Sequence, residues 1–402
     1  MVVQYNPFDL RFRTNPYPLY EEMRREDPIQ WSAFLQVWVF TRYRDNVLLL
    51  SDPRFSADRR RAQNPFAQAM IARQEEFGPL GRAPTMLSVD PPEHTRLRRI
   101  VSKAFTPRRV EDMRPYIWEV AQDLLAQALR RDGIEIIRDL AYPLPVIVIA
   151  EMLGVPRDER ETFKRWSDDV TATLGAPFVP AETLEQARQT VLEMTEYFRA
   201  IIQQRRRDPK NDLISALLHA EEQEQALSED EVLSTCILLL IAGNETTTNL
   251  IGNGVLALLQ HPGDWQRLRE TPDLIADAVE EMLRYDSPVQ ATSRVAREEM
   301  EIEGKVIKEG QVVIAVLAAG NRDPEAFPDP DRFDITRRNN RHLSFGDGSH
   351  FCLGAALART EAQIAVSALL ESLREPQLAS EQLEWSNSFI LRGLKSLPVS
   401  IG

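Results

Sequence analysis

The feature that most constrains this chain is a glycine-broken loop that leads to one cysteine and continues into an alanine-rich apolar helix, residues 344–360. Gly346, Gly348 and Gly354 let the backbone turn tightly or lie close against a flat partner, because glycine has no side chain. Cys352 stands where the amides that begin the following helix point, and this position favours a thiolate over a thiol. Such a cysteine is a nucleophile or a metal ligand, whereas an ordinary free cysteine is a small buried apolar residue.

The composition restricts the class of protein. A length of 402 residues allows two average domains or one large one, and the net charge of −13 argues against nucleic-acid binding. The two cysteines, Cys236 and Cys352, form no disulfide framework, and we interpret Cys236 as a core residue. Residues 1–9 lack the pattern of a signal peptide, and no apolar run approaches membrane-spanning length. We therefore expect a cytoplasmic protein without a membrane anchor.

The longest helical pattern, residues 228–258, changes character in mid-course. It is apolar for two turns, and then Gly243 is followed by an Asn, a Glu and three Thr residues. These side chains compete for backbone hydrogen bonds, so we expect a local bulge or an opened turn. A buried acid such as Glu245 beside a hydroxyl such as Thr246 can hold water and relay protons. A purely structural polar seam is the alternative.

Other segments carry weaker patterns. His94 and Arg98 are four residues apart, so they share one helix face and suit an anion, although such a face is commonly just solvated. Glu281 and Arg284 are three apart on another helix and are close enough to pair. Residues 56–85 are rich in Arg, Gln, Gly and Pro and lack a clean period, which predicts a long loop with one helical turn.

The cysteine loop resembles the haem-binding loop of the cytochrome P450 family, F-G-x-G-x-H-x-C-x-G. The matching positions are Phe345, Gly346, Gly348, His350, Cys352 and Gly354. The resemblance implies that Cys352 is the axial thiolate on a haem iron, where it pushes electron density onto the metal and favours O–O cleavage. It also implies that Phe345 shields the sulfur and that His350 reaches a haem propionate.

The polar part of the long helix, residues 242–247, resembles the oxygen-activating motif of the same family, A/G-G-x-D/E-T-T/S. The resemblance makes Thr246 the alcohol that orders a proton-bearing water and Glu245 the acid that supplies protons, with Ala242 and Gly243 beside the haem. The peroxide-driven branch of the family has Arg-Pro in place of this acid–alcohol pair. Its presence here favours reductive activation of O2.

Further roles follow from the resemblance. His94 and Arg98 would bind one haem propionate, and Arg294 the other. Glu281, Arg284 and Arg332 would form a buried charge network that fixes the loop around the haem. The substrate pocket would be lined by Phe66, Met70, Leu239, Val289 and Ile390.

The resemblance covers the whole chain and implies a mainly α fold with small β-sheets, the cytochrome P450 fold. This fold is a triangular helical prism in which haem lies between the long oxygen-binding helix and the helix of the cysteine loop. We expect a single haem domain over residues 1–402, with its β-rich part mainly at 29–56, 289–320 and 376–402.

The expected protein is a soluble, bacterial-type haem-thiolate monooxygenase with haem b. O2 and two external electrons would hydroxylate or epoxidise a lipophilic small molecule, and we expect a monomer that binds no nucleic acid. The electrons would come from a ferredoxin or flavodoxin-type donor with its NAD(P)H reductase, docked on a basic patch. This patch consists of Arg96, Arg99, Lys103, Arg108 and Arg109. Two alternatives stay open: a haem-thiolate enzyme with a peroxide-driven or non-hydroxylating outcome, and a non-enzymatic haem sensor or electron carrier.

Overall fold

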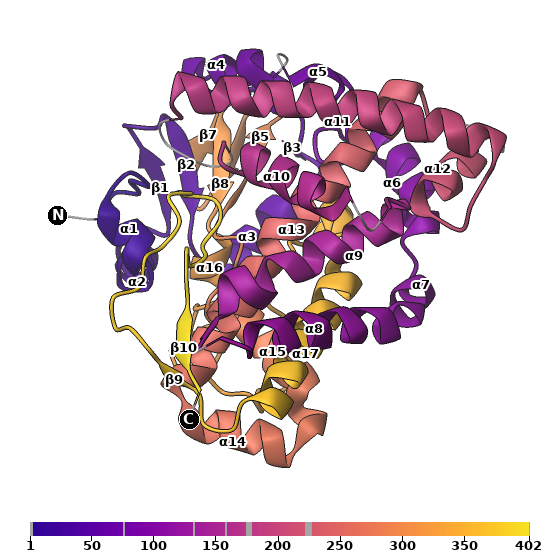
Figure 1. The fold of residues 1–402 in the computed structure, drawn as a ribbon. Coiled ribbons are helices and arrows are strands. Elements are labelled where there is room, and N and C mark those ends of the chain that lie inside the picture. Colours follow the sequence, from indigo (N-terminus) through magenta and orange to yellow (C-terminus); the bar gives the residue numbers. More distant parts are fainter. Residues whose placement is uncertain are drawn as a thin grey trace.

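The structure is a computed structural model that describes residues 3–74, 77–131, 133–156, 159–173, 179–221 and 227–401. Helices dominate it, and the larger sheet lies to one side of them, next to the N-terminal segment (Figure 1). Among the described residues, none of the helices combines the length and the apolar character that crossing a membrane requires.

The helices have the following bounds. They are α1 (Leu10–Thr14), α2 (Tyr17–Glu26), α3 (Tyr43–Ser51), α4 (Pro65–Gln74), α5 (Gly78–Arg82), α6 (Glu93–Ala104), α7 (Pro107–Asp112), α8 (Arg114–Ala128), α9 (Pro143–Leu153), α10 (Arg160–Thr171), α11 (Ala181–Arg207), α12 (Leu213–Glu221), α13 (Glu229–Gln260), α14 (Pro262–Glu270), α15 (Ile275–Tyr285), α16 (Leu317–Gly320) and α17 (Ala355–Ser372). Shorter turns are the 3-10 helices η1 (Arg59–Arg61), η5 (Pro272–Leu274) and η6 (Gly348–His350), and the π-helix η3 (Ile137–Ala141).

The strands are short. They are β1 (Ile29–Ser32), β2 (Val37–Phe40), β3 (Phe55–Ser56), β4 (Ile134–Glu135), β5 (Thr292–Ala296), β6 (Met300–Ile302), β7 (Lys305–Ile307), β8 (Val312–Ala315), β9 (Gln377–Leu378) and β10 (Pro398–Ser400). The larger sheet has the order β1-β2-β8-β5-β3, β4-β10-β9 form a second sheet, and β6 pairs with β7.

The larger sheet begins with the hairpin that the alternating pattern of residues 29–40 predicts. β1 and β2 pair antiparallel with Ile29 opposite Phe40, and β2 then pairs in parallel with β8. Ile29 and Phe40 are buried in one core with Leu49 of α3, because β-branched and aromatic residues pack well on a pleated surface. The sheet thereby supports β5, which carries Arg294 toward the candidate site.

Helix α13 runs through the middle of the helical part, between α9 and α17 (Figure 1). Its first residue is preceded by a capping box, in which the Ser228 hydroxyl accepts from the Glu231 amide and the Glu231 carboxylate accepts from the Ser228 amide. Most side chains of α13 are buried, which explains why its sequence is apolar almost all round.

Two expectations about local structure are wrong. The expected bulge in α13 is absent, since the helix is continuous from Glu229 to Gln260 and the Thr246 hydroxyl donates to the Ala242 carbonyl at 2.9 Å. This hydroxyl bonds within its own turn and leaves the backbone ladder intact. The expected long loop at 56–85 instead contains η1, α4 and α5. Asn64 caps α4 ahead of Pro65, and Pro also opens α5, so proline here begins helices.

Candidate functional site

The cysteine loop folds back on itself around two backbone hydrogen bonds. The amide of Cys352 donates to the Phe345 carbonyl at 2.9 Å, and the amide of Gly346 donates to the Leu343 carbonyl at 2.8 Å. Gly348 has a φ of 66° and approaches the backbone of α3 so closely that a Cβ atom would lie 2.6 Å from the Leu50 carbonyl oxygen. A side chain at this position would therefore displace the loop.

The protein groups around the Cys352 thiol act in opposite directions. Cys352 is an exposed residue, but the protein atoms around its thiol keep much of the solvent from the sulfur and raise its pKa, whereas the amides of Gly354 and Ala355 and the charges of Arg98 and Arg359 lower it. The amides thus have the effect that the sequence predicts, but the desolvation of the thiol outweighs them. A bound cation would supply the remaining stabilisation of a thiolate, since metal coordination deprotonates a thiol.

Phe345 is held in place by a charged side chain of α17. The guanidinium of Arg359 lies over its ring at 4.5 Å from the centroid, a cation–π contact. Arg359 in turn pairs with Glu280 of α15 at 2.6 Å, and the His342 Nε2 atom lies 3.2 Å from the same carboxylate. Burial alone would raise the pKa of Glu280, but hydrogen bonds from Arg359 and His342 lower it to about 2.

In the middle of α13, four positions that are not buried lie on one side of the helix. Leu239, Ala242, Gly243 and Thr246 follow the spacing i, i+3, i+4, i+7 of a single face. A Cβ atom added at Gly243 would meet no atom within 4 Å, so this face has room for a flat group close to the backbone. The resemblance placed Ala242 and Gly243 beside the cofactor, gave Thr246 a catalytic role and assigned Leu239 to the substrate pocket.

Glu245 lies beside this face and is unusual for a carboxyl group. Its Oε2 atom is buried and has no hydrogen-bond partner among the described residues. Burial raises the pKa of Glu245 to about 7, although the side chain of Asn249 opposes the shift. An acid with this pKa exchanges protons readily at neutral pH.

Four basic side chains from three elements come together near the cysteine loop. They are His94 and Arg98 of α6, Arg294 of β5 and His350 of η6. The rings of His94 and His350 lie 4.1 Å apart, and the buried Nε2 atom of His94 has no partner among the described residues. Burial and the charges of Arg294, His94 and Arg98 lower the pKa of His350 to about 4, with Asp90 opposing them. Such a cluster fits an anion with several oxygen atoms.

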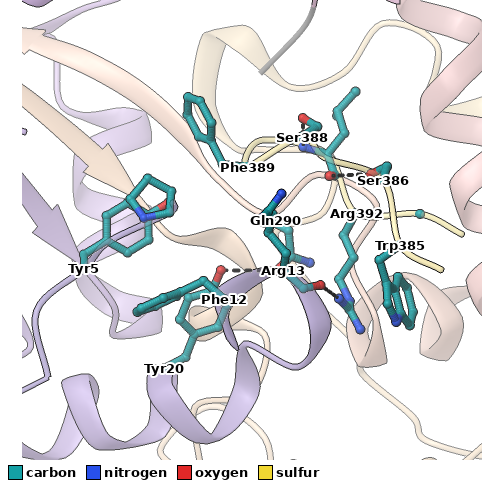
Figure 2. A pocket seen from close by; sticks show the side chains of 13 residues that line it. Tyr5, Phe12, Arg13, Tyr20, Gln290, Trp385, Ser386, Ser388, Phe389 and Arg392 are labelled. Atoms are coloured by element: carbon teal, nitrogen blue, oxygen red, sulfur yellow. Dashed lines mark hydrogen bonds between the residues drawn. The ribbon is translucent and has the colours of Figure 1, made fainter. Parts of the chain in front are cut away.

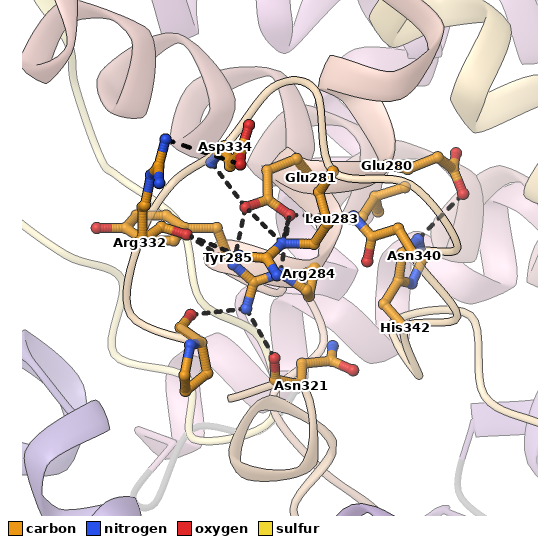
Figure 3. A network of polar contacts seen from close by, with 12 residues as sticks. Glu280, Glu281, Leu283, Arg284, Tyr285, Asn321, Arg332, Asp334, Asn340 and His342 are labelled. Atoms are coloured by element: carbon orange, nitrogen blue, oxygen red, sulfur yellow. Dashed lines mark hydrogen bonds and ion pairs between the residues drawn. The ribbon is translucent and has the colours of Figure 1, made fainter. Parts of the chain in front are cut away.

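Glu281 and Arg284 of α15 form a fully buried ion pair (Figure 3). Two nitrogens of Arg284 lie 2.8 Å from the two carboxylate oxygens of Glu281, and the remaining donors of Arg284 reach the carbonyls of Asn321, Pro330 and Arg332. Every donor of this arginine points to an acceptor, which compensates for the burial of its charge.

The sequence named the wrong arginine as the third partner. The side chain of Arg332 is 70 % exposed and only its backbone carbonyl joins the network, whereas Arg337 places its Nε atom 3.2 Å from the Glu281 carboxylate. The loop turns back at Asp334, whose amide donates to Glu281 at 2.8 Å, and this turn brings Arg337 inward. No local spacing pattern in the sequence distinguishes the two arginines.

Two of the expected pocket residues lie side by side. Val289 pairs with Leu391 in an isolated bridge, and the Gln290 amide donates to the Ile390 carbonyl at 2.8 Å. Leu239 is half-buried on α13, at the edge of the main core. The side chains of Phe66 and Met70 lie outside those that the structure describes.

A pocket lined in part by Leu391, the bridge partner of Val289, shows how the C-terminal loop is supported (Figure 2). The Tyr20 hydroxyl lies 3.3 Å from the Gln290 side-chain oxygen, and Arg392 donates to the Arg13 carbonyl at 2.6 Å while its guanidinium stacks on Trp385. The N-terminal segment thus anchors the loop that carries Ile390. The sequence did not identify this contact, because it joins the two ends of the chain.

The site fits haem. Cys352 offers one ligand to a metal, the open face of α13 offers room for a flat ring, and the basic cluster offers donors to carboxylates, including the orphaned Nε2 atom of His94. A cysteine ligand with a flat, dianionic macrocycle defines the class of haem-thiolate proteins.

Comparison with known proteins specifies the class. A family model described as cytochrome P450 matches residues 37–383. The biotin biosynthesis cytochrome P450 of Bacillus subtilis is 42% identical over 403 residues, which is 100% of both chains. The solved structure of the Bacillus subtilis bacillaene polyketide synthase cytochrome P450 PksS superposes with a TM-score of 0.90 at 39% identity, over 99% of this chain and 100% of that one. The structure of P450BioI, solved in complex with a hexadec-9Z-enoic acid ligated acyl carrier protein, superposes with a TM-score of 0.89 at 42% identity, over 98% of this chain and 100% of that one.

The chain therefore belongs to the cytochrome P450 family. It is a monooxygenase, an oxidoreductase that holds haem and iron, and the fold predicted from the sequence is confirmed.

Proposed function

We propose that residues 1–402 form one domain that holds haem b, with Cys352 as the iron ligand, and that this domain hydroxylates or epoxidises a lipophilic small molecule. The observation that carries the proposal is the combination of the cysteine loop with the open face of α13 that bears Thr246. Haem supplies the iron chemistry on which the thiolate favours O–O cleavage. The side chains of this protein would deliver protons and would bind and orient the cofactor.

Proton delivery is the work of α13. The Thr246 hydroxyl, which donates to the Ala242 carbonyl, has lone pairs left to accept from a water on the open face. The pKa of Glu245 is raised to about 7. In a large share of the molecules its carboxyl group is therefore protonated at neutral pH and can pass a proton to that water. The pair favours reductive activation of O2 over use of peroxide.

Binding and orientation of the cofactor are the work of the basic cluster and Phe345. His94, Arg98, Arg294 and His350 would hold the two propionates, with charge-assisted hydrogen bonds. Phe345, fixed by Arg359, would cover the sulfur and keep water from it.

We also propose a separate acidic electron donor of the ferredoxin or flavodoxin type, with its NAD(P)H reductase. Arg99, Lys103 and Arg108 are exposed and favour such a partner. Arg96, which the sequence also assigned to the docking patch, instead pairs with Glu93 and Glu231 and is largely withdrawn from it.

The substrate class is a lipophilic molecule with a long acyl chain. Leu239, Val289 and Ile390 offer apolar, half-buried surface, and the similar P450BioI was solved with an acyl group on a carrier protein. A spin-state titration with free fatty acids, the same acids on acyl carrier protein, steroids and macrolides tests this proposal. A response to steroids or macrolides alone contradicts it.

The carbon monoxide spectrum of the reduced protein tests the central assignment. We expect a strongly red-shifted Soret band in the wild type that is lost in Cys352→Ala, and retained in Cys236→Ala as the matched control. A wild-type band typical of histidine ligation contradicts the assignment. Turnover with NAD(P)H, reductase and donor, compared with turnover on peroxide alone, separates the monooxygenase from a peroxide-driven enzyme.

A further inference from the structure

Arg392 is a buried cation in the C-terminal loop that carries Ile390, with 7 % of its surface exposed. Each of its three guanidinium nitrogens donates a hydrogen bond. The Nε atom donates to the Asp286 carboxylate at 2.7 Å. The two terminal nitrogens donate to the carbonyls of Arg13 at 2.6 Å and Thr14 at 3.1 Å, and Figure 2 shows the contact with Arg13. A planar fork that is bonded at every nitrogen is held in one orientation.

Asp286, the acceptor of the Nε bond, is held from the N-terminal side as well. It follows the last residue of α15, and the Tyr17 hydroxyl at the start of α2 donates to the same carboxylate oxygen at 2.6 Å. Asp286 stands three residues before Val289, and Arg392 stands two residues after Ile390. The ion pair therefore joins the two segments that carry expected pocket residues.

The main chains of the same two segments are paired next to the ion pair. The Arg392 amide donates to the Pro288 carbonyl at 2.8 Å. The Gln290 amide donates to the Ile390 carbonyl, also at 2.8 Å. Because the amide of Arg392 belongs to this pairing, a displacement of its side chain displaces the main chain that carries Ile390.

Helix α13 contacts the loop from a further side. The Asn253 side-chain amide donates to the Arg392 carbonyl at 3.0 Å and to the Asp286 carbonyl at 3.3 Å. The next residue of the loop, Gly393, approaches α13 so closely that a Cβ atom would lie 1.7 Å from the Asn249 side-chain oxygen. The loop thus has a defined distance from α13, the helix whose open face forms one wall of the candidate haem site.

We propose that Arg392 is a positioning residue that determines substrate specificity. By fastening the C-terminal loop to Asp286 and to the N-terminal segment, it sets how far Val289 and Ile390 reach into the pocket. The inference rests on the proposed function, because it assumes that these two residues line the substrate pocket at the haem. Arg392 itself is assigned no contact with substrate or cofactor. The alternative is a role in stability alone.

Three variants loosen this attachment to different extents. Arg392→Met removes all three donors. Arg392→Lys keeps the charge but loses the planar fork that reaches one carboxylate and two carbonyls at once. Tyr17→Phe removes only the second donor to Asp286 and keeps the aromatic ring. If Arg392→Met fails to bind haem, Arg392→Lys and Tyr17→Phe decide the question.

The matched control is a second buried arginine, Arg205 at the end of α11. It is 4 % exposed, pairs with Asp212 and donates to the Gly154 carbonyl at 3.0 Å. Neither partner belongs to the segments that carry Val289 and Ile390. Arg205→Met therefore breaks a similar buried charge pair without touching the pocket loop. Ile390→Ala changes the pocket directly.

Binding of 1-alkylimidazoles to the haem-loaded protein tests the positioning without turnover. The imidazole nitrogen ligates the haem iron and the alkyl chain extends into the pocket, so the optical difference spectrum gives a dissociation constant for each chain length. We expect Arg392→Met to change the ratio of the octyl and dodecyl dissociation constants about fivefold or more, because a single methylene in an apolar pocket is already worth about tenfold in discrimination. Arg392→Lys and Tyr17→Phe should change the ratio less, in the same direction, and Arg205→Met should leave it unchanged.

The position at which a fatty acid is oxidised gives a second readout, in turnover. We expect Arg392→Met and Ile390→Ala each to redistribute the hydroxylated positions of hexadecanoic acid. Arg205→Met should keep the wild-type distribution, although it lowers stability in urea as Arg392→Met does. The double variant of Arg392 and Ile390 should differ from the sum of the single changes, since one residue acts through the other.

Two results would overturn the positioning role. One is an unchanged chain-length ratio in the Arg392 and Tyr17 variants while Ile390→Ala changes it. The other is an equal change in Arg205→Met, which would attribute the effect to lost stability. If Ile390→Ala also leaves the ratio unchanged, the pocket assignment is wrong and the positioning role is wrong with it. A wild type with the expected binding ratios but without O2-dependent turnover overturns the proposed reaction and leaves the positioning role standing.

Discussion

The Nε atom of Arg337 lies 3.2 Å from the carboxylate of Glu281, which also pairs with Arg284 at 2.8 Å. Glu281 is thus bound by two guanidinium groups, by the Asp334 amide and by the Asn340 side chain at 3.0 Å. Since its carboxylate is 0 % exposed, each of these donors replaces a water molecule. The network ties α15 to the segment that leads into the cysteine loop.

Replacing Arg337 should therefore destabilise the protein far more than replacing Arg332. We expect Arg337→Ala to lower the free energy of unfolding by about 1–3 kcal/mol, because it removes charged hydrogen bonds to a buried carboxylate. Arg332→Ala is the matched control and should stay within about 0.5 kcal/mol of the wild type, as an exposed side chain. Urea unfolding of the haem-loaded protein measures both, and equal losses would contradict the assignment.

His94 should contribute to haem retention through its orphaned Nε2 atom. His94→Phe keeps an aromatic ring against His350 but removes this donor, so haem should dissociate about 10- to 100-fold faster, the equivalent of one hydrogen bond to a charged group. Transfer of haem to an excess of apomyoglobin measures the rate. Thr95→Ala, an exposed position on the same helix, is the control. Unchanged transfer from His94→Phe would mean that His94 does not bind the cofactor.

The exposed part of the basic patch should govern association with the electron donor. Reversal of charge in Lys103→Glu and Arg108→Glu should slow the second-order reduction by an acidic ferredoxin about tenfold at low salt, with a smaller dependence on ionic strength. Arg207→Glu makes the same charge change at the exposed end of α11 and is the control. Stopped-flow reduction in the presence of carbon monoxide gives the rates, and equal slowing by all three variants would point to net charge instead of a docking surface.

The sequence predicted what depends on short spacings. The period of α13, the hairpin at 29–40 and the loop around Cys352 are local patterns, and the structure has each of them. The sequence did not predict contacts between distant segments. Arg337 and not Arg332 pairs with Glu281 because the chain turns at Asp334.

Competing local interactions explain the other differences. The polar residues of α13 were expected to open a turn of the helix. Instead, the Thr246 hydroxyl donates a hydrogen bond within the helix, and the Asn244 side chain donates one to Ser167 on a neighbouring helix. Likewise, Arg96 was expected to be part of a free basic surface, and its pairing with Glu231 joins segments 135 residues apart. Burial and partner choice of this kind are properties of the folded chain.

The raised pKa of Glu245 predicts a pH dependence of both stability and turnover. Its value of about 7 in the folded protein exceeds the ordinary 4.5, so the stability that the neutral form provides is complete below about pH 4.5 and is lost as the pH rises through 7. One pKa unit corresponds to about 1.4 kcal/mol, and with part of the side chain reached by solvent we expect a loss of about 2 kcal/mol.

Comparison with Glu245→Gln isolates this contribution, because every other titrating group is shared. Between pH 5 and pH 8, wild-type stability in urea should fall by that amount relative to the variant. In turnover, the proton-dependent step of the wild type should slow as Glu245 ionises through about pH 7, whereas Glu245→Gln should be slow and nearly independent of pH in this range. Parallel pH profiles of the two proteins, in stability and in turnover, would show that Glu245 is neither a buried neutral acid nor the proton donor.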